Sequence, residues 1–233
     1  MALKHTVCIA IDGEAAAGKS TIGSLLADRL GYLYFDTGVM YRAVTWAALQ
    51  RRLDVSDEAA VTALTENLNI QVTPPTCQDG RQYTVLADGM DVTWGVREPA
   101  VEAAVSIVAA YAGVRRALAE QQRRIGHTQD VVMVGRDIST VVMPDADLKV
   151  FMSASAEERA RRRYAELLAR GEDTGYDEVL ASMRQRDYMD SHRAVAPLRI
   201  ASDAVVIETD GLSIQQVLER VLALGDDRVL CRG

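Results

Sequence analysis

The stretch GEAAAGKST (residues 13–21) decides the fold. It matches the pattern Gly-x-x-x-x-Gly-Lys-Ser/Thr, whose glycines let the backbone wrap around a phosphate so that successive N–H groups point inward. A β-branched apolar run, 6–11, precedes it, and residues 20–30 after it carry apolar side chains at helical spacing. A helix start adds positive dipole beside a bound anion. The sequence therefore predicts a phosphate-binding loop, or P-loop, between a strand and a helix.

Each position of this loop has an expected role in binding ATP. We predict that Lys19 reaches the β- and γ-phosphates and that the Ser20 hydroxyl binds Mg²⁺. Lys19 is one of only three lysines in the chain and falls where the pattern requires one, which an ordinary glycine-bearing turn would not explain. The predicted ATP-binding loop residues are Gly13, Glu14, Ala15, Ala16, Ala17, Gly18, Lys19, Ser20 and Thr21.

Strand-like and helix-like segments alternate outward from the loop. A second strand is expected at 33–35, followed by a helix to about Arg52. Such alternation predicts a parallel sheet covered on both faces by helices, an α/β P-loop fold of three layers with five strands. The remaining strands are expected at 131–134, 148–152 and 204–207, and capping boxes at Ser155 with Glu158 and Ser213 with Gln216.

Residues 54–112 have a different pattern of expected secondary structure from the rest of the chain. A helix is expected at 59–68, and two strand-like stretches, 69–73 and 82–87, are separated by turn signals. This pattern predicts a small antiparallel insertion between two strands of the main sheet. The expected organisation is a P-loop core at 1–53 and 113–225, with a short lid at about 156–175, an insertion at 54–112 that binds the acceptor, and a tail at 226–233.

The composition of the chain limits which kinds of partner the protein can have. The 233 residues are 48% hydrophobic, enough for one sizeable core, and the net charge of −7 argues against a protein that coats nucleic acid. No apolar stretch reaches the roughly 20 residues that a membrane helix needs. The three cysteines, Cys8, Cys77 and Cys231, show neither a metal-ligand spacing nor a disulfide framework. We expect a soluble, cytoplasmic monomer with no nucleic-acid or membrane partner.

The chain offers fixed positive charge but no evident catalytic base. Neither a guanine-binding Asn-Lys-x-Asp signature nor an acidic pair after 131–134 is present, and that strand leads into Gly135-Arg136-Asp137 instead. Transfer of a phosphoryl group to another phosphate needs arginines that neutralise both anions, and an anionic acceptor needs no base. The histidines look incidental. Candidate arginines are Arg42, Arg115, Arg116, Arg136, Arg186 and Arg193.

Two helices leave alternatives open. On the helix expected at 177–192, Arg186 and Asp190 share one face with Arg193, and either a binding site or a solvated ion-pair stripe has this spacing. The arginine-rich helix at 156–170 is typical of a mobile lid over ATP, and also of an exposed charged helix.

Three motifs resemble those of bacterial cytidylate kinases. They are DTGVMYR at 36–42, Gly135-Arg136-Asp137 with Thr-Val-Val at 140–142, and Arg186-Asp187 leading to RAVAPL at 193–198. The resemblance covers nearly the whole chain, from Gly13 to about Leu224. It implies transfer of the γ-phosphoryl group of ATP, with Mg²⁺, to CMP or dCMP, giving ADP and CDP or dCDP.

The resemblance also implies roles for single residues. The implied catalytic set is Lys19, Arg42, Arg136 and Arg193. The implied CMP-binding groups are Thr37, Tyr41, Arg42, Arg136 and Arg193 around the phosphate, Ser106, Arg115 and Asp137 at the cytosine edge, and Arg186 and Asp190 at the sugar. For the lid we expect ATP contacts from Arg159 and Arg163.

The chain departs from the family at several of these positions. Proline and glycine are common where Glu14 and Ala16 stand, and we expect the Glu14 carboxylate to point outward, away from bound phosphates. Thr37 replaces a frequent serine and keeps its hydroxyl, while Met189 stands where a basic or small residue is frequent. Two alternatives remain open: a kinase for another small acceptor, such as UMP, AMP or a shikimate-like alcohol, and a nucleotide-dependent switch.

Overall fold

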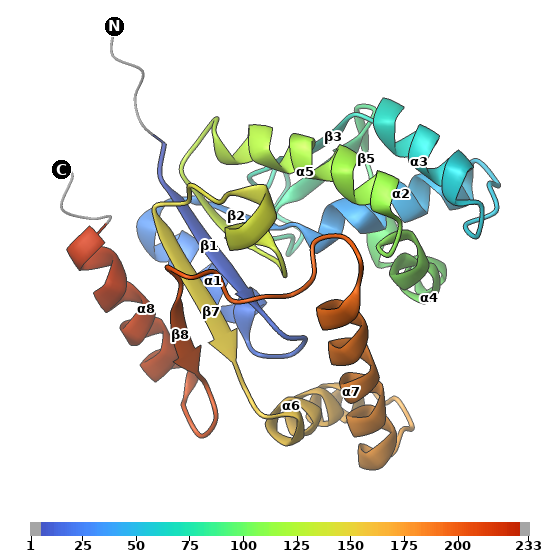
Figure 1. Ribbon diagram of the computed structural model, residues 1–233. Helices are drawn as coiled ribbons and strands as arrows, with labels where there is room; N and C mark the ends of the chain where they lie inside the picture. Colours follow the sequence, from blue (N-terminus) through green and yellow to red (C-terminus); the bar gives the residue numbers. More distant parts are fainter. Residues whose placement is uncertain (1–5, 229–233) are drawn as a thin grey trace, which may run out of the picture. The chain divides into compact units, whose positions relative to one another are not determined.

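The computed structural model describes residues 6–228 (Figure 1). In chain order the helices and strands are β1 (Cys8–Gly13), α1 (Lys19–Leu30), β2 (Leu33–Asp36), α2 (Gly38–Gln50), α3 (Glu58–Asn67), β3 (Ile70–Thr73), β4 (Thr84–Ala87), β5 (Met90–Asp91), η1 (Gly95–Arg97), α4 (Pro99–Val108), α5 (Ala112–Gly126), β6 (Val131–Val134), η2 (Ile138–Val142), β7 (Leu148–Ser153), α6 (Ala156–Ala169), α7 (Tyr176–His192), β8 (Val205–Glu208) and α8 (Ile214–Arg228).

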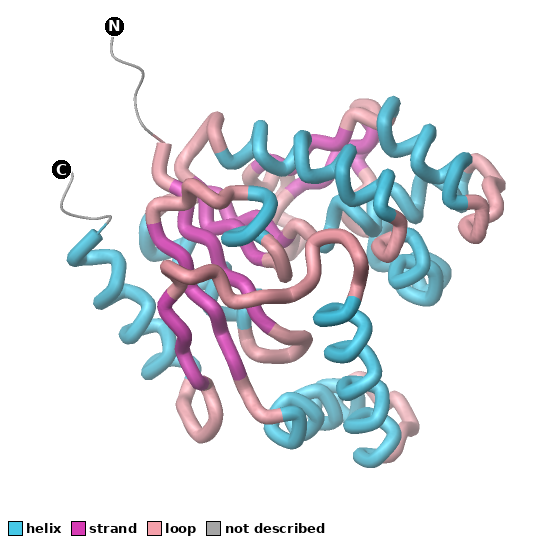
Figure 2. Tube along the Cα trace, in the orientation of Figure 1, coloured by secondary structure: helices cyan, strands magenta, loops and turns pink. Residues whose placement is uncertain are grey.

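The main sheet has five strands in the order β2-β6-β1-β7-β8. β1 pairs in parallel with β7, and β7 with β8, so the predicted parallel α/β sheet is confirmed. Figure 2 shows the strands alternating along the chain with helices. All six residues of β1 are buried, as an apolar run in a sheet covered on both faces requires. Burying a side chain such as Ile9 or Ile11 stabilises the fold by roughly 1.5–3 kcal/mol each.

The described chain forms two compact units, which we describe separately. Unit 1 comprises residues 6–8 and 27–133, and unit 2 comprises residues 9–26 and 134–228. Within unit 2, α8 packs on β7. Ser213 caps α8 reciprocally with Gln216, as expected. At α6 only half of the predicted capping box forms, because the Ser155 amide donates to Asp210 while the Ser155 hydroxyl accepts from the Glu158 amide.

Unit 1 contains the predicted antiparallel insertion as a sheet in the order β3-β4-β5. Asp88 and Gly89 turn the chain between β4 and β5 with φ of 50° and 79°, the left-handed values that a tight Asp-Gly hairpin needs. The sequence interpretation missed β5, α4 and α5. β5 has only two residues, too few to show an alternating pattern.

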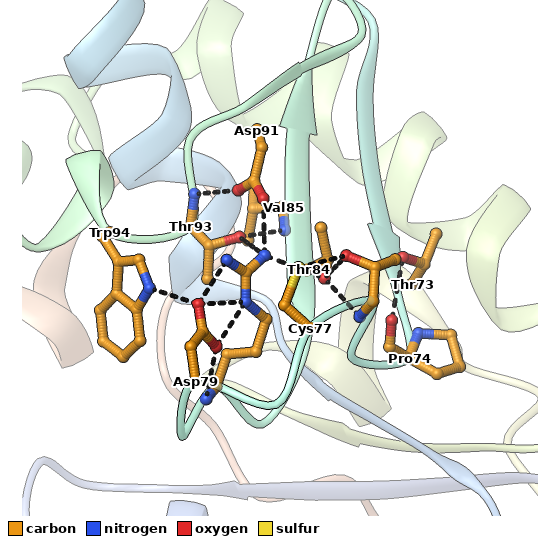
Figure 3. Close-up of polar contacts among 11 residues, drawn as sticks. Thr73, Pro74, Cys77, Asp79, Thr84, Val85, Asp91, Thr93 and Trp94 are labelled. Carbon is orange, nitrogen blue, oxygen red and sulfur yellow. Dashed lines mark hydrogen bonds and ion pairs between the residues drawn. The ribbon is translucent and has the colours of Figure 1, made fainter.

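A clasp of polar side chains closes the 76–84 loop of unit 1 (Figure 3). The Arg81 side chain is only 6% exposed and donates to both oxygens of Asp79 and to Oδ2 of Asp91. Trp94 Nε1 donates to the same Asp79 at 2.9 Å. We call Asp79, Arg81, Asp91 and Trp94 the Arg81 clasp.

The last helix is longer than expected. α8 continues to Arg228, into the segment expected as a tail, and residues 229–233 lie outside the described part of the chain.

Between residues 6 and 228, no helix has the length and apolar character needed to cross a membrane.

Candidate active site

The loop at 13–21 joins β1 to α1 in unit 2, as predicted. Gly13 has φ of +146°, and a Cβ atom there would lie 2.0 Å from the Met152 carbonyl oxygen, so only glycine allows β1 to meet β7 at this point. Gly18 also has a positive φ, +93°. Ala16 adopts +59°, an uncommon value for a residue with a Cβ. The loop thus has the tight, glycine-dependent path of a phosphate-binding turn.

Lys19 lies back across this loop. Its side chain is buried at 5% exposure, and Nζ donates to the Glu14 carbonyl oxygen at 2.5 Å. Ser20, the next residue, is exposed in the first turn of α1. An ammonium and a hydroxyl at the start of a helix are groups that can bind a phosphate chain and its cation.

The Glu14 side chain does not point outward, so that expectation was wrong. Glu14 is only partly exposed, and its Oε2 is buried without a hydrogen-bond partner. The expectation considered only repulsion between the carboxylate and a bound phosphate. Loop packing decides the direction instead, because Ala15 and Ala16 on the same loop pack in an apolar cluster with Ala160, Val179 and Met183.

Arg159 of α6 is a structural ion-pair partner in this structure. It is 3% exposed, and its two Nη atoms donate to the two oxygens of Asp187 on α7 at 2.9 and 2.6 Å. Nη1 also donates to the Ala15 carbonyl oxygen of the loop at 3.3 Å. Arg163, the other lid arginine proposed for ATP, pairs with Glu166 at 3.2 Å on the surface. The structure therefore connects Arg159 to the P-loop backbone through a buried contact.

Sequence reasoning missed Arg162, which also lies beside the P-loop. Its Nη2 donates to the Thr209 carbonyl oxygen at 2.8 Å, and Nη1 lies 3.9 Å from where a Cβ of Gly18 would be. The Thr209 hydroxyl in turn donates to the Ala17 carbonyl oxygen at 3.4 Å. A run of three consecutive arginines, 161–163, gives no signal that distinguishes the one facing the loop.

Four charged side chains of unit 2 form an alternating cluster. Asp190 accepts from Arg136 Nε at 3.0 Å and lies 3.6 Å from Arg193 Nη1. Arg193 Nη2 donates to Asp137 at 3.3 Å. All four side chains are at most 20% exposed. We call Arg136, Asp137, Asp190 and Arg193 the arginine–aspartate cluster, in which the carboxylates keep two guanidinium groups close despite their like charge.

This cluster bears on the solvated-stripe alternative for the α7 helix. The solvated-stripe alternative requires pairs within one exposed helix face, but Asp190 is mostly buried and bonds to Arg136, which follows β6. Arg193 lies just past the end of α7 with extended backbone angles, φ −62° and ψ 143°, so it does not continue the helix face as predicted. Arg186 is on α7, one turn before Asp190.

Asp12 is a second residue that the sequence interpretation missed. It is 1% exposed, and its carboxylate accepts hydrogen bonds from the backbone amides of Ile138 and Ser139 at 2.8 and 2.7 Å. Burial raises the pKa of this carboxyl above its ordinary value. A charged residue inside an apolar strand was the available signal, since a buried carboxylate requires hydrogen-bond donors.

Unit 1 holds the other predicted acceptor-binding residues. Thr37 and Tyr41 are buried near the start of α2, and the Arg115 guanidinium lies 5.3 Å from the centre of the Tyr41 ring. Arg115 Nη1 donates to the Ala109 carbonyl oxygen at 3.0 Å. Arg42 pairs with Glu102 of α4 at 2.5 Å, and Ser106 on the same helix is exposed.

The fold is a parallel α/β sheet with a glycine-dependent loop between β1 and α1. This loop carries a buried lysine, and paired arginines lie in the same unit. These features together define the class of P-loop phosphotransferases. A family model for cytidylate kinase matches residues 9–226. The chain belongs to the cytidylate kinase family.

Full-length relatives agree with this assignment. Proteins named cytidylate kinase from Herpetosiphon aurantiacus and Roseiflexus castenholzii are 52% and 54% identical to this chain. The first alignment covers 96% of this chain and 95% of the relative, and the second covers 94% of each. A solved structure of an uncharacterized protein from Eubacterium ventriosum has a TM-score of 0.52 at 10% identity, covering 96% of this chain and all of that one, which shows the fold alone.

Proposed function

We propose that this protein transfers the γ-phosphoryl group of ATP to CMP or dCMP, giving ADP and CDP or dCDP. Membership in the cytidylate kinase family carries the proposal. The chemistry of unit 2 supports it, because the P-loop and the arginine–aspartate cluster supply the positive charge that transfer between two phosphates needs. The acceptor phosphate is already an anion, so the reaction requires no general base.

The residues of the P-loop fit ATP with Mg²⁺. Ser20 offers an exposed oxygen next to Lys19, and Mg²⁺ prefers one or two protein oxygens together with substrate phosphates and water. When bound, Mg²⁺ would neutralise charge on the phosphates. We propose that Lys19 leaves the Glu14 carbonyl oxygen for the β- and γ-phosphates, while the amides of residues 13–21 hold the phosphate chain.

We propose that the acceptor-binding residues are those that the family resemblance implies: Thr37, Tyr41, Arg42, Ser106, Arg115, Arg136, Asp137, Arg186, Asp190 and Arg193. Two guanidinium groups already contact Asp190, but a carboxylate has about four acceptor sites and retains capacity for sugar hydroxyls. We assign Arg136 and Arg193 to the acceptor phosphate. Removal of either arginine would weaken neutralisation of the negative charge on that phosphate.

The experiment measures ADP formation from ATP and Mg²⁺ with CMP, dCMP, UMP, AMP, GMP or shikimate as acceptor. We expect turnover mainly with CMP and dCMP, since a site that hydrogen-bonds one base edge rejects analogues lacking it by up to ~10⁴. Strong turnover of another acceptor would contradict the cytosine assignment. ATP hydrolysis without transfer to any acceptor would instead favour a switch.

We further propose a cytoplasmic monomer whose partners are its small-molecule substrates. The net charge of −7 gives no basic surface excess for nucleic acid, and Cys8 and Cys77 are reduced thiols in the structure. Light scattering after gel filtration measures the mass directly, and a value near 25.4 kDa is expected.

A further inference from the structure

Asp12 connects the P-loop strand to the loop that carries Arg136 and Asp137. It precedes Gly13 in β1, and its two carboxylate oxygens accept from the successive amides of Ile138 and Ser139, at 2.8 and 2.7 Å. These amides follow Asp137 directly. The carboxylate therefore holds one end of the loop that carries two members of the arginine–aspartate cluster.

The other end of this loop is held by the same strand. The Gly135 amide donates to the Ile11 carbonyl oxygen at 3.0 Å. Arg136 and Asp137 thus lie between two attachments to β1, and from there they contact Asp190 and Arg193. If the Asp12 attachment is lost, the loop keeps its Gly135 bond to β1 and the bond from the Val141 amide to the Asp137 carbonyl oxygen at 2.9 Å, which lies within the turn into η2. The second attachment to β1 is gone, so the backbone of both cluster residues is held less firmly.

We propose that Asp12 is a positioning residue for the acceptor nucleotide. It touches no substrate and acts through Arg136 and Asp137, by holding their backbone where the cluster can form. The proposal rests on the acceptor role proposed above for those two residues.

The P-loop does not depend on this attachment in the same way. Gly13 pairs with Met152 of β7, so close that no Cβ would fit between them. The sheet therefore fixes the start of the P-loop whether or not Asp12 accepts its two hydrogen bonds. Loss of those bonds should weaken the binding of the acceptor much more than that of ATP.

The chemistry of residue 12 makes asparagine a sharp test. An ionised carboxylate accepts with both oxygens, and charge-assisted bonds to two amides offset the cost of burying it. Asparagine has nearly the same shape but only one acceptor, and its amino group would face a second donor. Asp12→Asn therefore removes one attachment point and changes little else.

The experiment compares wild type with Asp12→Asn in steady-state kinetics and in equilibrium ATP binding. We expect the KM for CMP to rise about tenfold, while ATP affinity changes by less than about twofold, because one buried donor is left without its acceptor. Asp130→Asn is the matched control: Asp130 accepts the Val7 amide at 2.8 Å and has no hydrogen bond to the cluster among those described, so the KM values of this variant should equal those of wild type.

An unchanged KM for CMP, or an equal loss of both affinities, would overturn the proposal. Amide hydrogen exchange in the wild-type chain tests the attachment without any variant or turnover: the Ile138 and Ser139 amides should be protected, and rapid exchange at both would also overturn it. Absence of wild-type CMP turnover would count against the proposed function alone, since the exchange result does not depend on it.

Discussion

Ala16 illustrates how a single residue of the P-loop is held in an unfavourable conformation. Its φ of +59° lies in the left-handed region, which costs a residue with a Cβ roughly 1–2 kcal/mol. The methyl group packs against the apolar cluster of α6 and α7. Packing therefore offsets part of the backbone strain.

Replacing Ala16 by glycine should stabilise the protein. We expect Ala16→Gly to raise the free energy of unfolding by about 0.5–1 kcal/mol, because relief of the strain exceeds the loss of one partly buried methyl. Denaturant unfolding measures this. Ala15→Gly is the control, since Ala15 is buried at 4% exposure without a positive φ, and it should destabilise. Equal losses in both variants would contradict the strain argument.

Lys19 and Lys149 form a natural pair for testing what a buried lysine does. Lys19→Met should lower kcat about 10²-fold or more with the fold intact, because a fixed charge at the transferring phosphate is lost. Lys149 donates to the Pro144 carbonyl oxygen at 2.6 Å and to Asp203 at 2.7 Å, remote in sequence from the loop. Lys149→Met should lower stability and leave both KM values unchanged. Near-normal turnover of Lys19→Met would remove Lys19 from the site.

At the level of elements, one ion pair joins α6, α7 and the P-loop. Arg159 and Asp187 have side-chain exposures of 4% and 24%. We expect Arg159→Met or Asp187→Leu alone to lower the free energy of unfolding by about 2–4 kcal/mol, because each leaves a charge without its partner. The double variant should lose at least about 1 kcal/mol less than the sum of the two singles. Strict additivity in urea unfolding would show that the pair does not act as a unit.

The Arg81 clasp gives unit 1 a pH-dependent contribution to stability. Hydrogen bonds from Arg81 hold the pKa values of Asp79 and Asp91 below their ordinary values. A carboxyl whose pKa is lower in the folded than in the unfolded chain stabilises the fold at any pH above its unfolded-state pKa. This stabilisation is lost as the pH falls through the folded-state pKa. The clasp therefore strengthens the fold near neutrality and weakens it in acid.

Thermal unfolding of Arg81→Leu tests the clasp. The variant should melt below wild type at pH 7, and the gap should narrow as pH falls below about 4, where unfolded carboxyls bind protons. Trp94, whose Nε1 donates to Asp79, reports the local change by fluorescence. A gap in melting temperature that is the same at pH 7 and in acid would contradict the assignment. Asp54→Asn, which removes an Asp with a lowered pKa outside the clasp, is the control for a general effect of charge.

Across the whole molecule, the sequence predicted those features that depend on neighbours in the chain. β6 lies at 131–134 as expected, and the P-loop joins β1 to α1, because apolar runs and glycine spacing are local signals. The family motifs also identified Arg136, Asp190 and Arg193, which the structure brings together.

Features that depend on distant partners could not be predicted. Asp12 meets amides 126 and 127 residues further along the chain, and Arg159 meets Asp187 on another helix. Neither contact leaves a periodic trace in the sequence. The expectation for the direction of the Glu14 side chain was wrong for a related reason. The environment of Glu14 is set by how the loop packs on α6 and α7, and repulsion from a phosphate does not describe that packing.

The close approach of Gly13 to Met152 has a consequence for mutational scanning of this gene. Every substitution at codon 13 would place a side chain where a backbone oxygen already lies, so the position would score as intolerant to all changes. Position 14, one step along the same motif, carries a glutamate that is partly exposed. A tolerance map would therefore single out codon 13 because of strand spacing, and intolerance there would not by itself identify a residue of the chemical step.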